Sequence, residues 1–473
     1  MIFLCLMFDR MAKKLFSTTT LWTAILISIL SACSKEDIIS SKDALLFTST
    51  DTLSFGQLFT GSGSVTQSFK IFNGNDQKLL LNSLSLSGGS NSVFLMNVNG
   101  VQGESFSNIE IAAGDSIYVF VSTLIPPTGM VLPFLVRDSI GIAWNNNQQF
   151  VQLNAEGRNA RWLKGGTILS DTSFSNDLPI VVQGPLTIAQ GATLSIAEGT
   201  SIYFDANAAL LVNGSLRATG NFYDSTRIRF SGSRLDEPYN TFPGSWPGII
   251  FSKSSYNNQL EYVSIINGIS GIQISGNGQP QLRLNGCVID NQLAYGIAAI
   301  NSNIDAINCQ ISNCQINNIY LAGGAYNFTH CTVVTYSNFL IAHDGPVAFL
   351  TDQDDQLNQY ALSGNFTNCI FYGSGGLVDN EITTAVAGAG VNTNFLNVFY
   401  SNSAEQAGVQ FENSLNNTEP GFNLIDFENN VFDFSLSPVS PCNNNGIGTT
   451  VIIDILGRRR SDQTPDIGCF EVE

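Results

Sequence analysis

Three segments of the chain repeat one short pattern: Asn285-Gly286-Cys287-Val288-Ile289, Ile307-Asn308-Cys309-Gln310-Ile311 and Thr329-His330-Cys331-Thr332-Val333. Their cysteines are 22 residues apart, and Cys369 follows Cys331 after 38 residues, which is one more repeat plus an insertion of 16. Fixed periods of this length are typical of stacked repeat architectures. Because the segments alternate over four or five residues and are separated by Gly and Asn, they predict coils of short strands.

Coils of short strands predict an all-β fold with a right-handed parallel β-helix over residues 162–375. Equivalent positions then stack along the axis at the inter-strand spacing of about 4.8 Å. The repeated cysteines are expected to form an inward ladder, because a buried free cysteine packs as a small apolar side chain. Disulfides between rungs are disfavoured, since side chains in register point the same way. A catalytic thiol is disfavoured too, because His330 is the sole basic neighbour.

The preceding region, residues 40–160, has short apolar segments separated by Gly- and Asn-bearing breaks, which predicts an antiparallel β-sandwich. Leu53-Ser54-Phe55-Gly56, the segment 69–73 and the closing Leu153-Asn154-Ala155-Glu156-Gly157 resemble the immunoglobulin-like modules that precede extracellular β-helices. No metal or catalytic constellation is visible in this region. The sandwich is therefore interpreted as a spacer, with glycan binding as the alternative.

Composition and charge exclude several classes of partner. The chain has 43 Gly, 14 Pro and 32 Phe, only 12% charged residues, and a formal net charge of −18. A surface of this charge repels nucleic acid and anionic lipid headgroups, so neither is an expected partner. Solubility must come from the abundant uncharged polar residues, which is consistent with an all-β protein.

The N-terminal residues have the order of a signal peptide. Lys13 and Lys14 precede the uncharged apolar run 21–30, which is shorter than the roughly 20 residues that span a bilayer. The run ends in Leu30-Ser31-Ala32-Cys33, which resembles a bacterial lipobox. Residues 1–33 are therefore predicted to be a lipoprotein signal peptide and lipobox, with lipidation at Cys33 and membrane attachment through acyl chains. The alternative is an ordinary secretory signal with a coincidental cysteine.

The segment after the lipobox bears on localisation. Ser34-Lys35-Glu36-Asp37 resembles the surface-export signals of Bacteroidetes lipoproteins. We therefore expect a lipid-anchored protein of the outer membrane that is exposed on the cell surface, with a periplasmic orientation as the alternative.

Five motifs follow one another near the C-terminus: Glu419-Pro420-Gly421-Phe422, Phe432 to Leu436, Ser440-Pro441-Cys442, Asp454 to Arg460 and Asp466 to Glu471. Their order resembles the end region of choice-of-anchor Q proteins, which belong to the pectate-lyase-like superfamily. Together with the repeats, the resemblance covers most of the chain after residue 160 and implies a Bacteroidetes β-helix lipoprotein. The chain departs from the family at Asn444, where an Asp is usual.

Residues 376–473 are predicted to form the last coils and a C-terminal cap, because an open solenoid end exposes unpaired backbone and core side chains. Arg458 to Arg460 with Asp454, Asp466 and Glu471 are expected to form an ionic clasp in it, with a solvated charge cluster as the alternative. Cys442 and Cys469 lie outside the 22-residue ladder, and an exported protein can keep disulfides. We predict a bridge between them, with two buried thiols as the alternative.

The loop 231–245 is the longest irregular excursion in the early coils. Arg234, Asp236, Tyr239 and, just after the loop, Trp246 lie close together in sequence and are the candidate ligand contacts. The alternative is a loop that packs over a coil without binding anything.

Catalytic signals are weak. Between residues 254 and 457 the single Lys or Arg is Arg283, which is too little positive charge for a lyase acting on an acidic polymer. A hydrolase needs two carboxylates about 5–9.5 Å apart, and the one plausible acid group lies at 343–356, where Asp352, Asp354 and Asp355 follow His343 and Asp344. We assign no catalytic residue, metal or cofactor.

The expected function is therefore that of a non-enzymatic cell-envelope lipoprotein, a surface adhesin or glycan-binding scaffold whose partners are neutral glycans or another surface protein. The alternative is a carbohydrate-active enzyme, a polysaccharide hydrolase or lyase, with its site near 343–356.

Overall fold

The computed structural model describes residues 37–276, 280–416, 419–461 and 463–472. The lipobox and Cys33 lie outside these residues. The chain divides into two compact units, one formed by Gly63–Leu124, Leu135–Ala155 and the chain up to Phe55, the other by Gly56–Ser62, Ile125–Phe134 and everything from Glu156 onward. Among the described residues no helix has the length and apolar character needed to cross a bilayer.

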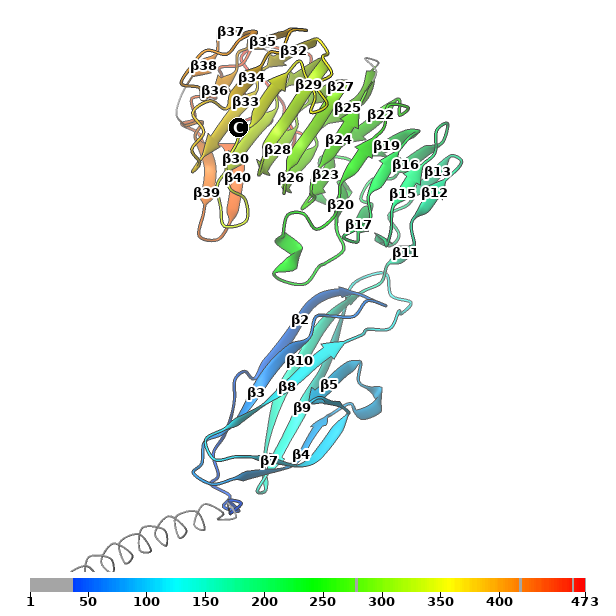
Figure 1. Cartoon of the computed structure of the whole chain (residues 1–473), viewed down its shortest axis with the longest axis vertical. Helices are drawn as coiled ribbons and strands as arrows, with labels where there is room; N and C mark the ends of the chain where they lie inside the picture. The colour runs from blue at the N-terminus through cyan, green and yellow to red at the C-terminus, as the bar shows by residue number, and fades with distance from the viewer. Residues whose placement is uncertain (1–36, 277–279, 417–418, 462, 473) are drawn as a thin grey trace, which may run out of the picture. The chain divides into compact units, whose positions relative to one another are not determined.

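The first unit is built on a β-sandwich of two antiparallel five-stranded sheets, as the sequence predicted (Figure 1). Inward residues alternate with outward ones: in β3 Phe69 and Ile71 are buried, and in β4 Leu79 and Leu81 are buried. One sheet consists, in spatial order, of β1(Leu46–Thr48), β3(Gln67–Asn73), β8(Ser116–Thr123), β5(Phe94–Val98) and β6(Val101–Gln102). The other consists of β2(Thr52–Phe59), β10(Asn147–Arg158), β9(Phe134–Trp144), β4(Leu79–Leu86) and β7(Ser105–Ile111), and a 3₁₀ turn η1(Gly89–Asn91) follows β4.

The second unit is a parallel β-helix, which confirms the fold predicted from the cysteine repeat (Figure 1). An 11-stranded parallel sheet forms one face. Its strands are β11(Arg161–Leu163), β14(Ile180–Val182), β17(Ser201–Phe204), β20(Ile228–Gly232), β23(Val263–Ile266), β26(Val288–Gln292), β28(Gln310–Cys314), β30(Thr332–Tyr336), β33(Ile370–Ser374), β36(Phe399–Tyr400) and β38(Leu415–Asn416).

A 17-stranded sheet forms the other two faces. The face that we call the groove face contains β13(Thr172–Phe174), β16(Thr193–Ile196), β19(Ser215–Thr219), β22(Asn258–Glu261), β25(Pro280–Asn285), β32(Leu362–Thr367), β35(Val391–Leu396) and β37(Val409–Glu412). The face that we call the stack face contains β12(Gly166–Ile168), β15(Leu186–Ile188), β18(Leu210–Val212), β21(Ile249–Phe251), β24(Ile272–Ser275), β31(Ala348–Thr351) and β34(Ile382–Ala385). The long strands β27(Tyr295–Ile307) and β29(Asn317–Thr329) pair with both faces and join them. Short 3₁₀ turns η2(Asp224–Thr226) and η3(Tyr239–Thr241) lie in the loops.

In the coils from Tyr262 to Asn397, one corner of the β-helix turns through a left-handed residue. Asn308, His330 and Asn368 have φ angles of 51°, 54° and 54° there, and Asn tolerates this conformation better than most side chains. Gly286 occupies the same corner with φ 63°, and a Cβ at this position would lie 2.6 Å from the ring of Tyr262. The corner therefore requires both a left-handed residue and, at Gly286, the absence of a side chain.

Each corner residue is followed by a fully buried side chain, and in four coils this is a cysteine. Cys287, Cys309, Cys331 and Cys369 are all 0% exposed and free, which confirms the predicted inward ladder. Burial raises the pKa of the first three thiols well above the usual value, so they stay protonated. The repeat did not predict Cys314, which is also a free, buried thiol in the same core.

We expect Cys309→Ala to lower the free energy of unfolding by about 1–3 kcal/mol, because the removed sulfur leaves a small cavity in a close-packed core. Alkylation of native protein should miss the ladder and label it only after denaturation. Rapid native labelling of Cys309, detected by peptide mapping, would show that this position faces solvent.

The C-terminal segment (residues 419–472) lies along the outer side of the coils, whereas the sequence analysis placed it over the open end. Its hairpin of β39(Phe422–Asp426) and β40(Val431–Leu436) (Figure 1) is followed by an irregular chain with several turns. Hydrogen bonds join Asn445 O to Asn397, Ile453 O to Asn308 and Ile455 O to Arg227. The segment thus runs back across successive coils and buries the outward aromatic residues of β30 and β33, among others Tyr336 and Tyr372.

The disulfide predicted between Cys442 and Cys469 is absent, and both residues are free, buried thiols. The reason is the register of the segment: Cys442 O accepts a hydrogen bond from Ile467 N at 3.0 Å, and Cys469 N bonds Thr332 Oγ1 at 3.0 Å. Cys442 therefore lies beside Ile467, and the alternative of two buried thiols is the one the structure shows.

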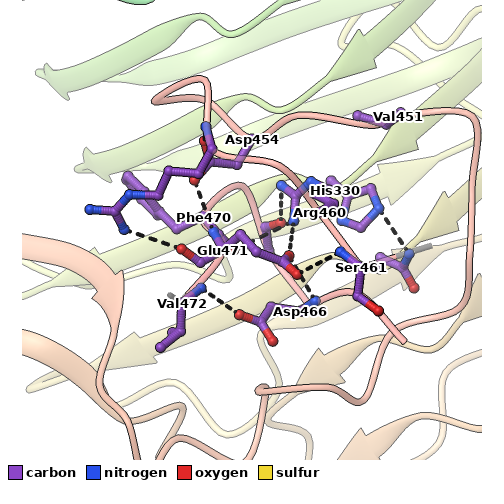
Figure 2. A network of polar contacts seen from close by, with 12 residues as sticks. His330, Val451, Asp454, Arg460, Ser461, Asp466, Phe470, Glu471 and Val472 are labelled. Atoms are coloured by element: carbon purple, nitrogen blue, oxygen red, sulfur yellow. Dashed lines mark hydrogen bonds and ion pairs between the residues drawn. The ribbon is translucent and has the colours of Figure 1, made fainter. Parts of the chain in front are cut away.

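The ionic clasp predicted in this segment is present in part, as the ion pair of Arg460 and Glu471 (Figure 2). Arg460 donates to Glu471 Oε2 at 3.0 Å, and its other terminal nitrogen donates to Asn308 Oδ1 at 2.9 Å. Asp454 and Asp466 accept backbone N–H groups from Glu471 and Val472 at 3.0 and 2.7 Å. Because all four charged side chains are buried, their hydrogen bonds are what makes burial tolerable.

Candidate functional site

The loop 231–245 brings three of the four predicted ligand contacts together. Arg234 binds the carboxylate of Asp236 through two nitrogens, at 2.7 and 2.6 Å, and its guanidinium lies 4.1 Å from the ring centroid of Tyr239. Asn267 and Asn291, on the coils, hold the loop by donating to Asn240 O and Thr241 O at 2.7 Å each. The guanidinium is thus occupied by its own loop, as the packed-loop alternative expected.

Trp246, the fourth predicted contact, is a core residue, which corrects the prediction. Its side chain is 0% exposed, stacks on Phe204 with ring centroids 4.6 Å apart, and donates its indole N–H to Ile266 O at 2.9 Å. A side chain that fills the interior and whose polar atom is satisfied has no group left to offer a ligand.

The acid group at 343–356 divides into residues with different tasks. Asp352 is 0% exposed and accepts three backbone hydrogen bonds, from Ala387, Gly388 and Gly390, at 2.6–2.8 Å. Burial opposes ionisation of this carboxyl, but the three N–H groups outweigh it and lower its pKa. Asp352 is therefore ionised and holds the loop 387–390 in place. It is not placed to donate a proton.

The neighbouring acids serve the loop as well. Asp354 accepts from the N–H groups of Gln356 and Asn358 at 3.0 and 2.8 Å, which closes a tight turn. His343 is buried against Glu381 at 2.9 Å. Asp355 remains exposed, and the hydroxyl of Tyr320 donates to it at 3.5 Å. Asp344, the remaining acid of the group, is exposed as well, so the carboxylates that reach solvent here are those of Asp344 and Asp355.

The groove face carries a continuous row of outward polar side chains that the sequence analysis did not predict. Strand pairing places one residue of each coil in register: Ser195, Arg217, Gln259, Arg283, Asp305, Asn327, Asn365, Asn394 and Gln410. Successive members are separated by one strand spacing of about 4.8 Å. We call this set the polar row.

A groove of about 500 Å³ lies over the middle of the polar row. Arg217, Gln259, Arg283, Asp305 and Asn327 line it, together with side chains from the neighbouring positions. Arg283 and Asp305 are 64% and 42% exposed and face each other at 3.5 Å. An exposed pair at this distance is weak, so both groups remain available to a ligand's hydroxyls.

The sequence carries a signal for the polar row. Arg283, Asp305, Asn327 and Asn365 each stand four residues before a ladder cysteine. Because the coils repeat, residues at a fixed offset from the ladder cysteines occupy the same position in every coil, and polar residues at that offset indicate an outward row. Arg217 could not be found in this way, since the loop 231–245 lies between it and the ladder.

No group of three or more His, Cys, Asp or Glu side chains among the described residues is arranged to hold a metal ion. What the groove offers is hydrogen bonding, with amide and guanidinium donors and amide and carboxylate acceptors in one line.

Comparison with known proteins leaves the family open. No family model matches the chain, and neither does any curated protein. An α-1,3-glucanase catalytic unit of glycoside hydrolase family 87 from Streptomyces thermodiastaticus strain HF3-3 aligns over 74% of this chain and 88% of its own, with 11% identity and a TM-score of 0.20. A family 123 glycoside hydrolase from Clostridium perfringens aligns over 24% of this chain and only 26% of its own length, with 13% identity and a TM-score of 0.18. A PapD-like domain of human CEP192 aligns over 27% and 91%, with 8% identity and a TM-score of 0.18. Similarities this weak carry no argument about activity.

Proposed function

We propose that the protein is a non-enzymatic, glycan-binding scaffold of the cell envelope, and that the groove over the polar row is its binding surface. The observation that supports this most is the row itself, which presents uncharged amides and a paired Arg283 and Asp305 in register along the helix axis. A chain of sugar residues presents hydroxyl groups at regular intervals, and a regular row of donors and acceptors is complementary to it.

The experiment is a glycan array probed with the chain from residue 34 onward. We expect binding that falls at least about tenfold when Arg283 and Asn327 are both replaced by alanine, a change equivalent to about 1.4 kcal/mol. Arg229→Ala is the matched control, because it removes a partly exposed arginine from β20, on the 11-stranded face. Equal binding by the groove variant would contradict the proposal.

The lipid anchor and the location are part of the same proposal. The lipobox at Cys33, the surface-export resemblance of Ser34 to Asp37, and the choice-of-anchor Q resemblance of the C-terminal motifs support a Bacteroidetes lipoprotein of the outer membrane, with the sandwich as an immunoglobulin-like module. Its partners would be the membrane, through the acyl chains, and glycans or another surface protein.

Cys33→Ala should leave the chain unprocessed or soluble in the periplasm, because thioether attachment of the acyl chains requires that sulfur. Partitioning into detergent, compared with the unmodified chain, measures the effect. If the variant still partitions fully into the detergent phase, the anchor is elsewhere.

A further inference from the structure

A second set of outward side chains, on the stack face, forms an aromatic surface. Tyr320 of β29 and Phe349 of β31 are in register on adjacent strands, and their rings are parallel within 2° with centroids 5.9 Å apart. Tyr295 continues the set, with its ring centroid 5.5 Å from that of Tyr320. All three side chains are half-buried, so each has part of its ring in solvent. We call these three residues the aromatic stack.

The aromatic stack adjoins a pocket of about 270 Å³. Ser275 of β24 and Ile300 of β27 line the pocket. Each lies two residues further along its strand than the residue that is in register with Tyr320. The opposite wall is the loop 352–360, with Asp355 and Asn358. The hydrogen bond from the Tyr320 hydroxyl to Asp355 joins the stack to the pocket.

Carboxylates outnumber cationic groups in the pocket lining, which contains Asp354 and Asp355 but a single cation, Lys253. The other polar lining residues are amides and hydroxyls, which both donate and accept hydrogen bonds: Ser275, Asn301, Gln356, Asn358 and Tyr360. Burial, reinforced by the charge of Asp355, raises the pKa of Tyr320 to about 12, so its hydroxyl stays protonated. Because two carboxylates face one ammonium group, an anionic ligand would be repelled and a ligand rich in hydroxyl donors would be accepted.

The pocket wall is held in place before any ligand arrives. Asp352 is bonded to the backbone of residues 387–390, and Asp354 closes the turn at 356–358. A preorganised wall lowers the entropy that binding would otherwise cost. The buried acids that serve no reaction are thus explained as supports of this wall.

We propose that the aromatic stack and this pocket form a subsite for a neutral sugar residue, whose apolar face lies against the solvent-exposed parts of the Tyr320 and Phe349 rings while its hydroxyl groups enter the pocket. The inference rests on the proposed function and adds a ligand class and a second face to it. Flat, rigid aromatic rings offer contact area at a low entropic cost, and their electron-rich faces attract the polarised C–H groups of a sugar ring.

The test uses the full-length chain in detergent, titrated with neutral hexasaccharides of glucose, mannose, xylose and galactose by calorimetry. We expect at least one to bind, and Phe349→Leu to weaken it about tenfold, since leucine retains apolar volume but has no flat face. Tyr320→Ala should weaken it at least as much. Tyr223→Ala is the control, because Tyr223 is 61% exposed and lies outside the stack and its pocket. A thermal transition within a few degrees of the unmodified chain establishes that Phe349→Leu is folded.

The outcomes separate this inference from the proposed function. Unchanged affinity in folded Phe349→Leu, with binding lost in the groove variant that combines Arg283→Ala and Asn327→Ala, overturns the subsite and leaves glycan binding at the groove. Binding of array glycans together with no binding of any neutral hexasaccharide overturns the ligand class. No binding to any glycan overturns the proposed function as well.

Discussion

Replacing Arg460 with methionine should lower the free energy of unfolding of the β-helix by about 3–5 kcal/mol, because it leaves the carboxylate of Glu471 buried without its partner. Arg460 is only 3% exposed and also binds Asn308 Oδ1 and Gly468 O, so the change removes the link between the C-terminal segment and the coils (Figure 2). Chemical denaturation of variant and unmodified chain measures the difference.

Two further variants determine whether the cost comes from the unpaired charge. Arg460→Met combined with Glu471→Met should cost less than the single change, since no charge is then buried alone. Arg229→Ala should cost no more than about 1 kcal/mol, because its ion pair with Asp224 is exposed. A loss below about 1 kcal/mol for Arg460→Met alone would show that the clasp does not stabilise the segment.

Stability should fall steeply in mild acid because of His330. Its side chain is fully buried, and burial, followed by the charge of Arg460, lowers its pKa from 6.5 to about 3. The geometry agrees: Nε2 accepts from Asn368 Nδ2 at 3.0 Å, and Ile447 fixes the orientation of that amide through both its N–H and its C=O. A proton added to Nε2 would therefore point at the N–H donor of Asn368, and the hydrogen bond between the two side chains would be lost.

The sign of this pH dependence follows from the number of protons that His330 binds in the folded and in the unfolded chain. Between about pH 6.5 and pH 3 the unfolded chain binds a proton at His330 that the folded chain does not, so this contribution is complete above pH 6.5 and is lost as the pH falls toward 3. At pH 4.5 the free energy of unfolding should therefore be about 2–3 kcal/mol lower than at pH 7.5. Chemical denaturation at the two pH values measures it.

His330→Asn is the matched control, because asparagine occupies the same left-handed corner at Asn308 and Asn368. The variant should lose the histidine's share of the pH dependence while all carboxylates titrate as before. An identical pH dependence in the two chains would mean that His330 is protonated in the folded state.

The cysteine spacing was enough to predict the β-helix, because a parallel coil forces one inward residue into the same place in every turn. The same spacing could not show that Trp246 is internal: it follows the long loop 231–245, where no repeat sets the register. The free state of Cys442 and Cys469 depends on which backbone groups pair across the C-terminal segment, and no local pattern encodes that.

The two proposed binding surfaces were missed for a related reason. Outward positions of a β-helix carry no hydrophobic period, so the sequence marks the polar row only by its offset from the cysteine ladder, and strand pairing is needed to follow the row beyond the ladder. The aromatic stack brings together Tyr295, Tyr320 and Phe349, which lie 25 and 29 residues apart because an insertion lengthens the second coil. The acid group at 343–356 was noticed, but its hydrogen bonds, and not its composition, reveal that two of its members hold a loop.

The most direct test of the central claim follows the fate of a bound glycan. A glycan captured on the array is incubated with the protein for many hours, and its chain length is then measured by mass spectrometry. We expect a saturable complex from which the glycan is recovered with its length and mass unchanged. Recovery of shortened or unsaturated fragments, absent from a control without protein, would contradict it and identify the protein as an enzyme.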